Sequence, residues 1–82
     1  MRFTYDPHCN IAYIRFGEKR GEVETIRISD ELNVDLAPDG TVYGIELLNA
    51  NDQLRREDRD RVLIINEASG EQAELPLAIG GK

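Results

Sequence analysis

The stretch Ala37-Pro38-Asp39-Gly40 decides the fold, because it separates two runs in which apolar and polar residues alternate. Asn33-Val34-Asp35-Leu36 precedes it, and the longer run 42–48 follows it. Proline presets the backbone for a turn, aspartate bonds the backbone ahead of it, and glycine accepts a positive φ. The pattern therefore predicts two antiparallel strands joined by a tight loop.

The same alternation continues toward the N-terminus and predicts further short strands. They cover residues 3–5, 11–16, 22–28 and 32–36, and polar or glycine-bracketed turns separate them. With the strand at 42–48 they form an antiparallel β-meander of about five strands. The residues expected to face inward are Ile14, Phe16, Ile26, Ile28, Leu32, Val34, Leu36, Ile45 and Leu47.

Gly44 lies in the middle of the longest predicted strand. Glycine lowers strand propensity, and in that position it often marks a β-bulge or a close approach of another group to the backbone. We expect one of the two here.

The C-terminal part predicts one short helix near residues 52–61 and a β-hairpin over 62–78. Val62 to Ile65 are apolar on both faces, which is typical of a central strand or of an edge strand covered by another subunit. Pro76 has no N–H to donate, so its strand belongs at an edge. The fold class is α+β, mainly β.

The length of 82 residues predicts a single small domain, 1–82. Its parts are the meander core (1–50), a helix or loop (51–61) and the C-terminal hairpin (62–78). A boundary, if the chain has one, would fall within residues 50–61. A chain this short has a thin core, so self-association is a plausible further source of stability.

The formal net charge of −6 indicates which classes of molecule the protein is expected to bind. Nucleic acids and anionic membrane surfaces attract clustered Lys and Arg, so we expect neither as a partner. A basic protein is the natural complement of an acidic one. The alternative is that the charge only keeps a small protein soluble.

The sequence suggests a cytoplasmic protein. A single cysteine, Cys9, cannot form an intramolecular disulfide. The residues after Met1 do not resemble the apolar region of a signal peptide. No stretch approaches the roughly 18 apolar residues that a membrane span needs.

Residues with catalytic or metal-binding chemistry are few, and we expect no enzyme, cofactor or metal. His8 and Cys9 are adjacent, whereas zinc sites need about four ligands and a nucleophile needs a separately positioned base. Ser29 and Ser69 lie in predicted turns. The alternative function is a small-ligand or divalent-metal-binding domain that uses the carboxylates of Asp6, Asp35, Asp39 and Glu46.

Eight residues are candidates for contact with a partner. The tyrosines combine apolar area with a hydroxyl group, although a strand tyrosine is more often cross-strand packing. The apolar strand 62–65 suggests a homodimer with the sheet edge or its outer face as the interface. The candidates are Tyr5, Asp6, Tyr13, Asp35, Tyr43, Glu46, Leu63 and Ile65.

Several segments resemble, in order and spacing, the small bacterial YuzE-like family, a domain of unknown function. They are Tyr5-Asp6-Pro7, Ala12-Tyr13-Ile14-Arg15-Phe16, Ile28-Ser29-Asp30-Glu31, Val34-Asp35-Leu36 with Asp39-Gly40, and Gly44-Ile45-Glu46-Leu47-Leu48-Asn49-Ala50. The resemblance covers residues 1 to about 50. The chain departs from it at His8-Cys9-Asn10, where the family pattern usually carries an acidic residue and small residues.

The resemblance implies no catalytic residues. It implies a compact cytoplasmic protein, and some members are encoded beside small proteins similar to RNase-type toxins. Together with the charge, this leads to the expectation of a non-enzymatic protein-interaction module. It would associate with itself, bind a basic partner protein, or do both, with an antitoxin-like role as one form.

Overall fold

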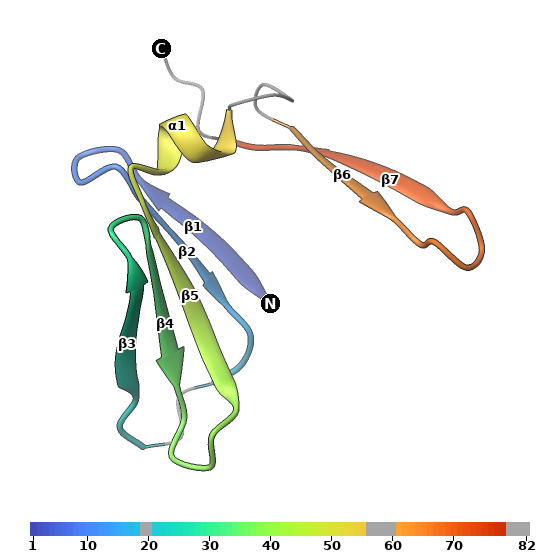
Figure 1. Ribbon diagram of the computed structural model, residues 1–82. Helices are drawn as coiled ribbons and strands as arrows, with labels where there is room; N and C mark the ends of the chain where they lie inside the picture. The colour runs from blue at the N-terminus through green and yellow to red at the C-terminus, as the bar shows by residue number, and fades with distance from the viewer. Residues whose placement is uncertain (19–20, 56–60, 79–82) are drawn as a thin grey trace. The chain divides into compact units, whose positions relative to one another are not determined.

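The computed structural model describes residues 1–18, 21–55 and 61–78 of the chain. The chain divides into two compact units, Met1–Ala50 and Asn51–Lys82. Figure 1 labels the helix and the strands of the described residues.

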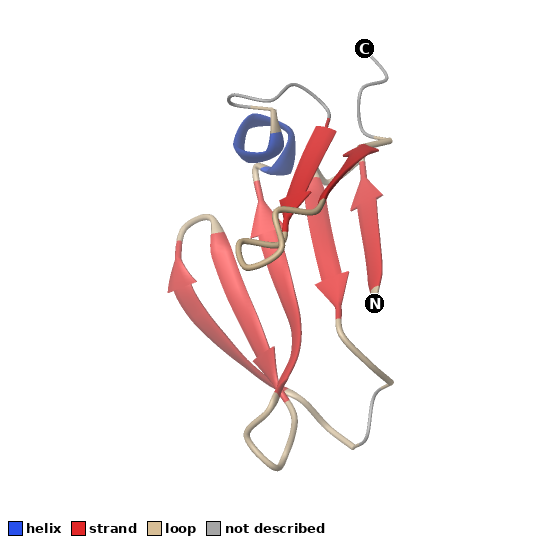
Figure 2. Ribbon diagram, turned by 90° about the vertical axis from the view of Figure 1, so that its right-hand side faces the viewer, coloured by secondary structure: helices blue, strands red, loops and turns tan. Residues whose placement is uncertain are grey.

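The first unit is a five-stranded, fully antiparallel sheet (Figures 1 and 2). Its strands are β1 (Arg2–Asp6), β2 (Ile11–Arg15), β3 (Glu24–Ser29), β4 (Leu32–Leu36) and β5 (Val42–Leu48). Their order across the sheet is β1-β2-β5-β4-β3, so the longest strand lies in the centre. The predicted class and the five antiparallel strands are confirmed.

The strand order differs from the consecutive order of a meander. β2 pairs with β5 instead of with β3, and β3 lies at the far edge beside β4. Alternation shows which residues share a face, but it does not say which strands are neighbours.

The loop between β4 and β5 has the predicted turn chemistry. The Gly40 N–H donates to the Ala37 carbonyl (2.9 Å), and the Ala37 N–H donates to the Thr41 carbonyl (2.8 Å). Asp39 Oδ1 accepts the Thr41 N–H at 3.0 Å. Gly40 has a φ of 91°, which only glycine adopts at low cost. This turn fixes the register of the two central strands.

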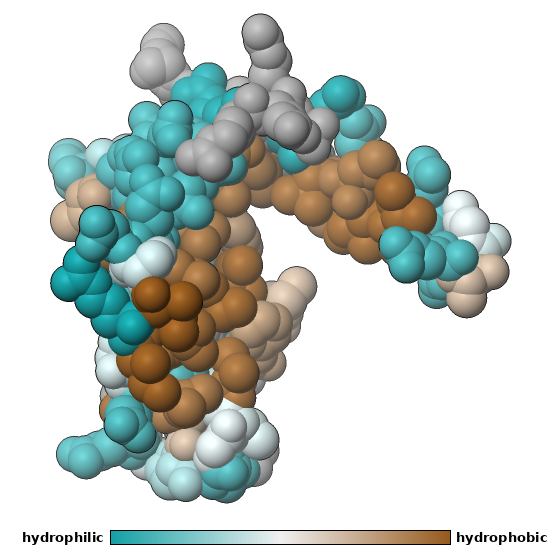
Figure 3. All heavy atoms as spheres, in the orientation of Figure 1, coloured by the Kyte–Doolittle hydropathy of each residue, from teal (hydrophilic) through white to brown (hydrophobic). Residues whose placement is uncertain are grey.

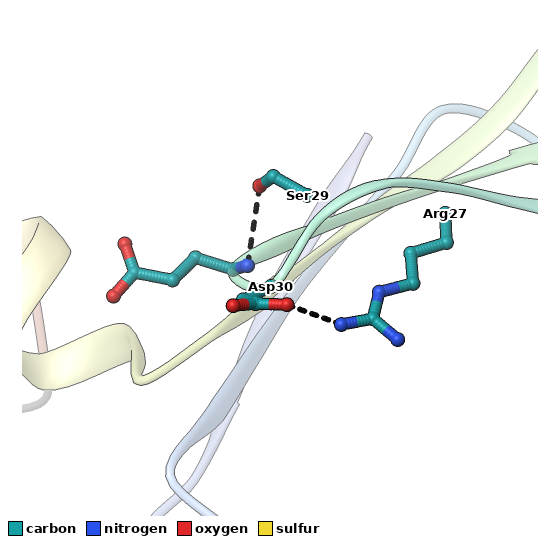
Figure 4. A network of polar contacts seen from close by, with 4 residues as sticks. Arg27, Ser29 and Asp30 are labelled. Carbon is teal, nitrogen blue, oxygen red and sulfur yellow. Dashed lines mark hydrogen bonds and ion pairs between the residues drawn. The ribbon is translucent and has the colours of Figure 1, made fainter.

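A second polar turn joins β3 to β4 (Figure 4). Ser29 Oγ accepts the Glu31 N–H at 3.2 Å, and the Arg27 guanidinium pairs with the Asp30 carboxylate. Both charged side chains are largely exposed, so the pair contributes little to stability. A register shift between Arg27 and Ser29 marks a bulge at this end of β3.

The core is thinner than the sequence predicts. Among the described residues, only Ala12 and Ala50 are buried apolar side chains. The prediction that Phe16, Ile26 and Ile28 face a core is wrong, because these side chains are 46%, 38% and 57% exposed. Phe16 lies beyond the end of β2, and the two isoleucines lie on the edge strand β3.

The second unit contains most of helix α1 (Ala50–Leu54) and a two-stranded antiparallel sheet. The helix begins two residues before the predicted start. Residues 56–60 of the predicted helix lie outside the described residues. Arg61, the predicted last residue of the helix, is instead the first residue of a strand.

The predicted C-terminal hairpin is confirmed as β6 (Arg61–Ile65) paired with β7 (Gln72–Pro76). Asn66 organises the turn between them. Its Oδ1 accepts the N–H groups of Ala68 and Ser69 at 3.0 and 3.1 Å. Its own N–H donates to the Glu71 carbonyl at 2.8 Å.

In the described part of the chain, no helix combines the length and the apolar composition of a membrane span.

Candidate interaction surface

One face of the five-stranded sheet carries a continuous row of large apolar side chains. Residues directly opposite each other on paired strands point to the same side of a sheet. The register therefore aligns one residue from each strand, in the order Phe3, Ile14, Ile45, Val34 and Ile26. We call this side of the sheet the apolar face, and Figure 3 shows hydrophobic residues gathered along the sheet.

A second row runs beside the first on the apolar face. It consists of Tyr5, Ala12, Leu47, Leu32 and Ser29. Only Ala12 in these two rows is fully buried. Phe3 and Ile26, at the two edges, remain 39% and 38% exposed, and the side chains between them are half-buried. The five strands by themselves therefore bury the side chains of the apolar face only in part.

The opposite side of the sheet is polar, and we call it the tyrosine face. Its two central rows, read from β1 to β3, are Thr4, Tyr13, Glu46, Asn33 and Arg27, and then Arg2, Arg15, Gly44, Asp35 and Thr25. Asn33 Nδ2 donates to Glu46 Oε1 at 2.8 Å, within one row.

Tyr13 connects the two rows of the tyrosine face. Its hydroxyl donates to Asp35 Oδ2 at 2.7 Å, and the Thr25 hydroxyl donates to the other carboxylate oxygen at 2.6 Å. To reach Asp35, the phenol crosses the backbone of β5 at Gly44. A Cβ on Gly44 would lie 2.2 Å from Tyr13 Oη and 2.5 Å from Cζ.

The structure has both features at Gly44: another group approaches its backbone closely, and a bulge lies next to it. The ring of Tyr13 approaches the Gly44 backbone closely, and the β4–β5 register shifts between Asp35 and Leu36. Leu36 pairs with Val42, so the bulge contains Tyr43. The Tyr43 ring lies 6.4 Å from the Tyr13 ring, between centroids.

Burial raises the pKa of the Tyr13 phenol well above its ordinary value of 10, and the hydrogen bond to the Asp35 carboxylate raises it further. The hydroxyl therefore remains a donor throughout the physiological pH range. Its hydrogen bond to Asp35 therefore does not depend on pH within that range.

The structure brings four of the eight candidate residues together. Tyr13 bonds Asp35, lies opposite Glu46 and contacts Tyr43 on the tyrosine face. Tyr5 belongs to the apolar face. Asp6 uses Oδ1 to accept the His8 N–H at 2.9 Å in the turn after β1.

A polar chain at one end of the sheet was not predicted. Tyr5 Oη donates to Asn10 Oδ1 at 3.2 Å, Asn10 Nδ2 donates to Asn49 Oδ1 at 3.3 Å, and Asn49 Nδ2 donates to Glu31 Oε2 at 3.2 Å. Asn10 and Asn49 have positive φ values of 57° and 52°. Asparagine tolerates this backbone region better than most residues, which is the one signal that the sequence offered.

The four carboxylates of the alternative metal-binding hypothesis do not form one cluster. Asp6 and Asp39 each accept a backbone N–H in their own turn. Asp35 and Glu46 lie on the tyrosine face, where each accepts a side-chain hydrogen bond. Among the described residues, no group of three or more His, Cys, Asp or Glu side chains is placed to hold a metal ion.

A depression of about 360 Å³ lies beside the β4–β5 turn. Phe16, Pro38, Val42 and Tyr43 are among its lining residues. Asp35 and Glu46 are not among them. The depression is therefore separate from the hydrogen-bonded centre of the tyrosine face.

The hairpin β6–β7 also has two unlike sides. Leu63 and Ile65, the two candidates in this unit, lie opposite Glu74 and Gln72. Val62 and Ile64 lie opposite Leu75 and Ala73, so all four residues on that side are apolar. We call this second side the apolar side of the hairpin.

Comparison with known families gives a match over residues 2–51, to the model described as "Protein of unknown function (DUF2283)". The matched segment is more than half of the chain and covers the whole five-stranded sheet. The chain belongs to this family. The match confirms the resemblance to a small family of unknown function up to about residue 50. No curated protein and no solved structure matches the chain.

Proposed function

We propose that this member of the family is a non-enzymatic protein-interaction module, which associates with itself or with a basic partner protein. The observation that supports this most strongly is the row of apolar side chains that crosses the whole sheet from Phe3 to Ile26. The apolar side of a β-sheet gains stability when another layer covers it.

The net charge supports the basic partner. At −6, the chain attracts a cationic protein at long range, and the attraction weakens as salt screens it. An antitoxin that neutralises a basic toxin would use such a charge. The exposed free thiol of Cys9 suits a reducing cytoplasm.

Co-purification tests this proposal. A basic protein captured by the tagged chain from its host is identified, purified and remixed with the chain, and the mass of the mixture is measured in solution. We expect a complex that is weakened by high salt. A chain that neither self-associates nor binds any such protein would contradict the proposal.

A further inference from the structure

The sequence of the edge strand β1 is complementary to itself when it is read in the opposite direction. The strand is Arg2-Phe3-Thr4-Tyr5-Asp6, and in the five-stranded sheet it pairs only with β2 (Figure 2). The backbone N–H and C=O groups on its outer side therefore have no partner within that sheet. An edge of this kind can accept a further antiparallel strand.

A second copy of β1, antiparallel to the first and centred on Thr4, gives a favourable pair at every position. Arg2 lies opposite Asp6 of the second copy, and Asp6 lies opposite Arg2 of the second copy. Phe3 and Tyr5 lie opposite each other in the same way, and Thr4 lies opposite Thr4. Opposite charges, two aromatic rings and two threonines are the cross-strand pairs that stabilise antiparallel strands.

This register also keeps the two faces of the sheet separate. Arg2 and Thr4 lie on the tyrosine face, whereas Phe3 and Tyr5 lie on the apolar face. Directly opposite residues share a face, so charged residues meet charged residues and rings meet rings. The apolar face of one copy would continue into the apolar face of the other.

The charges around β1 favour such a partner. Arg2 lies directly opposite Arg15 on β2, and like charges in that position destabilise a sheet. Among the described residues, neither guanidinium is in an ion pair. Asp6 uses only Oδ1, which accepts the His8 N–H. In the paired strands each Arg2 gains a carboxylate, and these local contacts oppose the long-range repulsion between two chains of charge −6.

No other strand that can reach an edge offers β1 the same complement. The charged ends of β1 need an acidic and a basic residue that are four residues apart. β6 (Arg61–Ile65) contains no acidic residue, and β7 (Gln72–Pro76) contains no basic one. On β3, Glu24 and Arg27 are three residues apart, so only one of them can face its counterpart. A second β1 therefore matches better than the hairpin of the same chain or the opposite edge of the sheet.

We propose that two copies of the chain join edge to edge through β1, antiparallel about Thr4, so that their two sheets form one continuous sheet. Because the same strand serves in both copies, the contact is isologous and two-fold symmetry closes it at a dimer. This inference rests on the proposed function and specifies the partner and the surface of its self-associating form.

A cysteine at the centre of symmetry tests the register. In the Cys9→Ser background, Thr4→Cys places two thiols directly opposite each other across the dimer. Opposed Cα atoms on antiparallel strands lie about 4.5–5.5 Å apart, which a disulfide can bridge. We expect mild oxidation to give a disulfide-linked dimer. Thr25→Cys in the same background is the matched control, because Thr25 is exposed on the other edge strand, and it should remain uncrosslinked.

Charge reversal tests the two ion pairs. Arg2→Asp would oppose aspartate to aspartate, and Asp6→Arg would oppose arginine to arginine. Each variant alone should raise the dimer dissociation constant at least about tenfold. An equal mixture of the two variants should dimerise about as tightly as wild type, because every aspartate then faces an arginine. Arg2→Asp also places a carboxylate opposite Arg15 in its own chain, so it does not weaken the fold.

Two outcomes would overturn the inference. One is crosslinking of Thr4→Cys no faster than that of Thr25→Cys, and the other is a mixture that dimerises no more tightly than the single variants. The crosslinking comparison decides alone if Asp6→Arg does not fold. A wild-type chain that dimerises without this crosslink, or a monomer that binds a basic protein, would refute the β1 contact and leave the proposed function intact.

Discussion

The centre of the tyrosine face depends on one missing methyl group. Tyr13 reaches Asp35 across Gly44, and a Cβ at Gly44 would lie 2.2 Å from the Tyr13 hydroxyl. The hydrogen bond from Tyr13 to Asp35 therefore requires that residue 44 has no side chain. Substitutions at either position should show this coupling.

We predict that Gly44→Ala lowers the free energy of unfolding by about 1–3 kcal/mol, the usual cost of overpacking. The new methyl group displaces the Tyr13 ring and breaks its bond to Asp35. Gly17→Ala is the matched control, because nothing lies within 4 Å of a Cβ there. Urea unfolding measures both. Equal stabilities for the two variants would show that Tyr13 does not lie over Gly44.

The raised pKa of Tyr13 predicts a pH dependence of stability. Above pH 10 the phenol ionises in the unfolded chain while it stays protonated in the folded one, so the unfolded state gains stability as the pH rises. The stabilisation that Tyr13 provides is complete below pH 10 and declines above it.

Tyr13→Phe tests this dependence. The variant should be less stable than wild type by about 1 kcal/mol at neutral pH, since one hydrogen bond to a carboxylate is lost. The difference between the two should narrow as the pH rises above 10. Unfolding free energies measured from neutral to alkaline pH check this, and a constant difference would contradict the raised pKa.

At the scale of elements, three loops at one end of the sheet are tied together through Asn49, which follows β5. Its side chain bonds Asn10 in the β1–β2 turn and Glu31 in the β3–β4 turn. Its φ of 52° is a backbone conformation that costs most L-residues about 1–2 kcal/mol.

Two substitutions separate these contributions. Asn49→Gly removes the side-chain bonds but keeps the backbone conformation accessible, whereas Asn49→Ala removes the bonds and strains the backbone. We expect the alanine variant to be less stable than the glycine variant by about 1 kcal/mol in denaturant unfolding. A glycine variant that is as unstable as the alanine variant would assign the effect to the side chain alone.

Local chemistry made several elements predictable from the sequence. The turn at Pro38-Asp39-Gly40 and the alternation around it gave β4 and β5 within a residue. The pairing of β2 with β5 was not predictable, because alternation is the same whichever strand lies alongside. The helix was predicted to extend too far, since its sequence has only Leu54 as a strong apolar anchor.

The candidate site was predictable only in part. Side-chain chemistry marks Tyr13, Asp35, Tyr43 and Glu46 as candidates. The register places Tyr13, Asp35 and Glu46 on one face, and the Tyr43 ring lies beside the Tyr13 ring. Tyr13 and Asp35 are 22 residues apart, so their contact follows from strand order and not from local sequence. In the local sequence, only the glycine at position 44 indicated that a side chain crosses the strand there.

At the scale of the whole molecule, the described residues include more exposed large apolar side chains than buried ones. Ala12 and Ala50 are its buried apolar residues, while large apolar side chains such as Phe3 on the sheet and Ile64 on the hairpin are 39% and 50% exposed. Self-association that covers such side chains would add to the stability of a small sheet protein.

The most direct test of this account is the mass of the wild-type chain in solution, measured by sedimentation equilibrium over a wide dilution series. Self-association into a dimer predicts twice the chain mass of 9.3 kDa at high concentration, falling toward 9.3 kDa on dilution. A mass of 9.3 kDa at every concentration would contradict self-association.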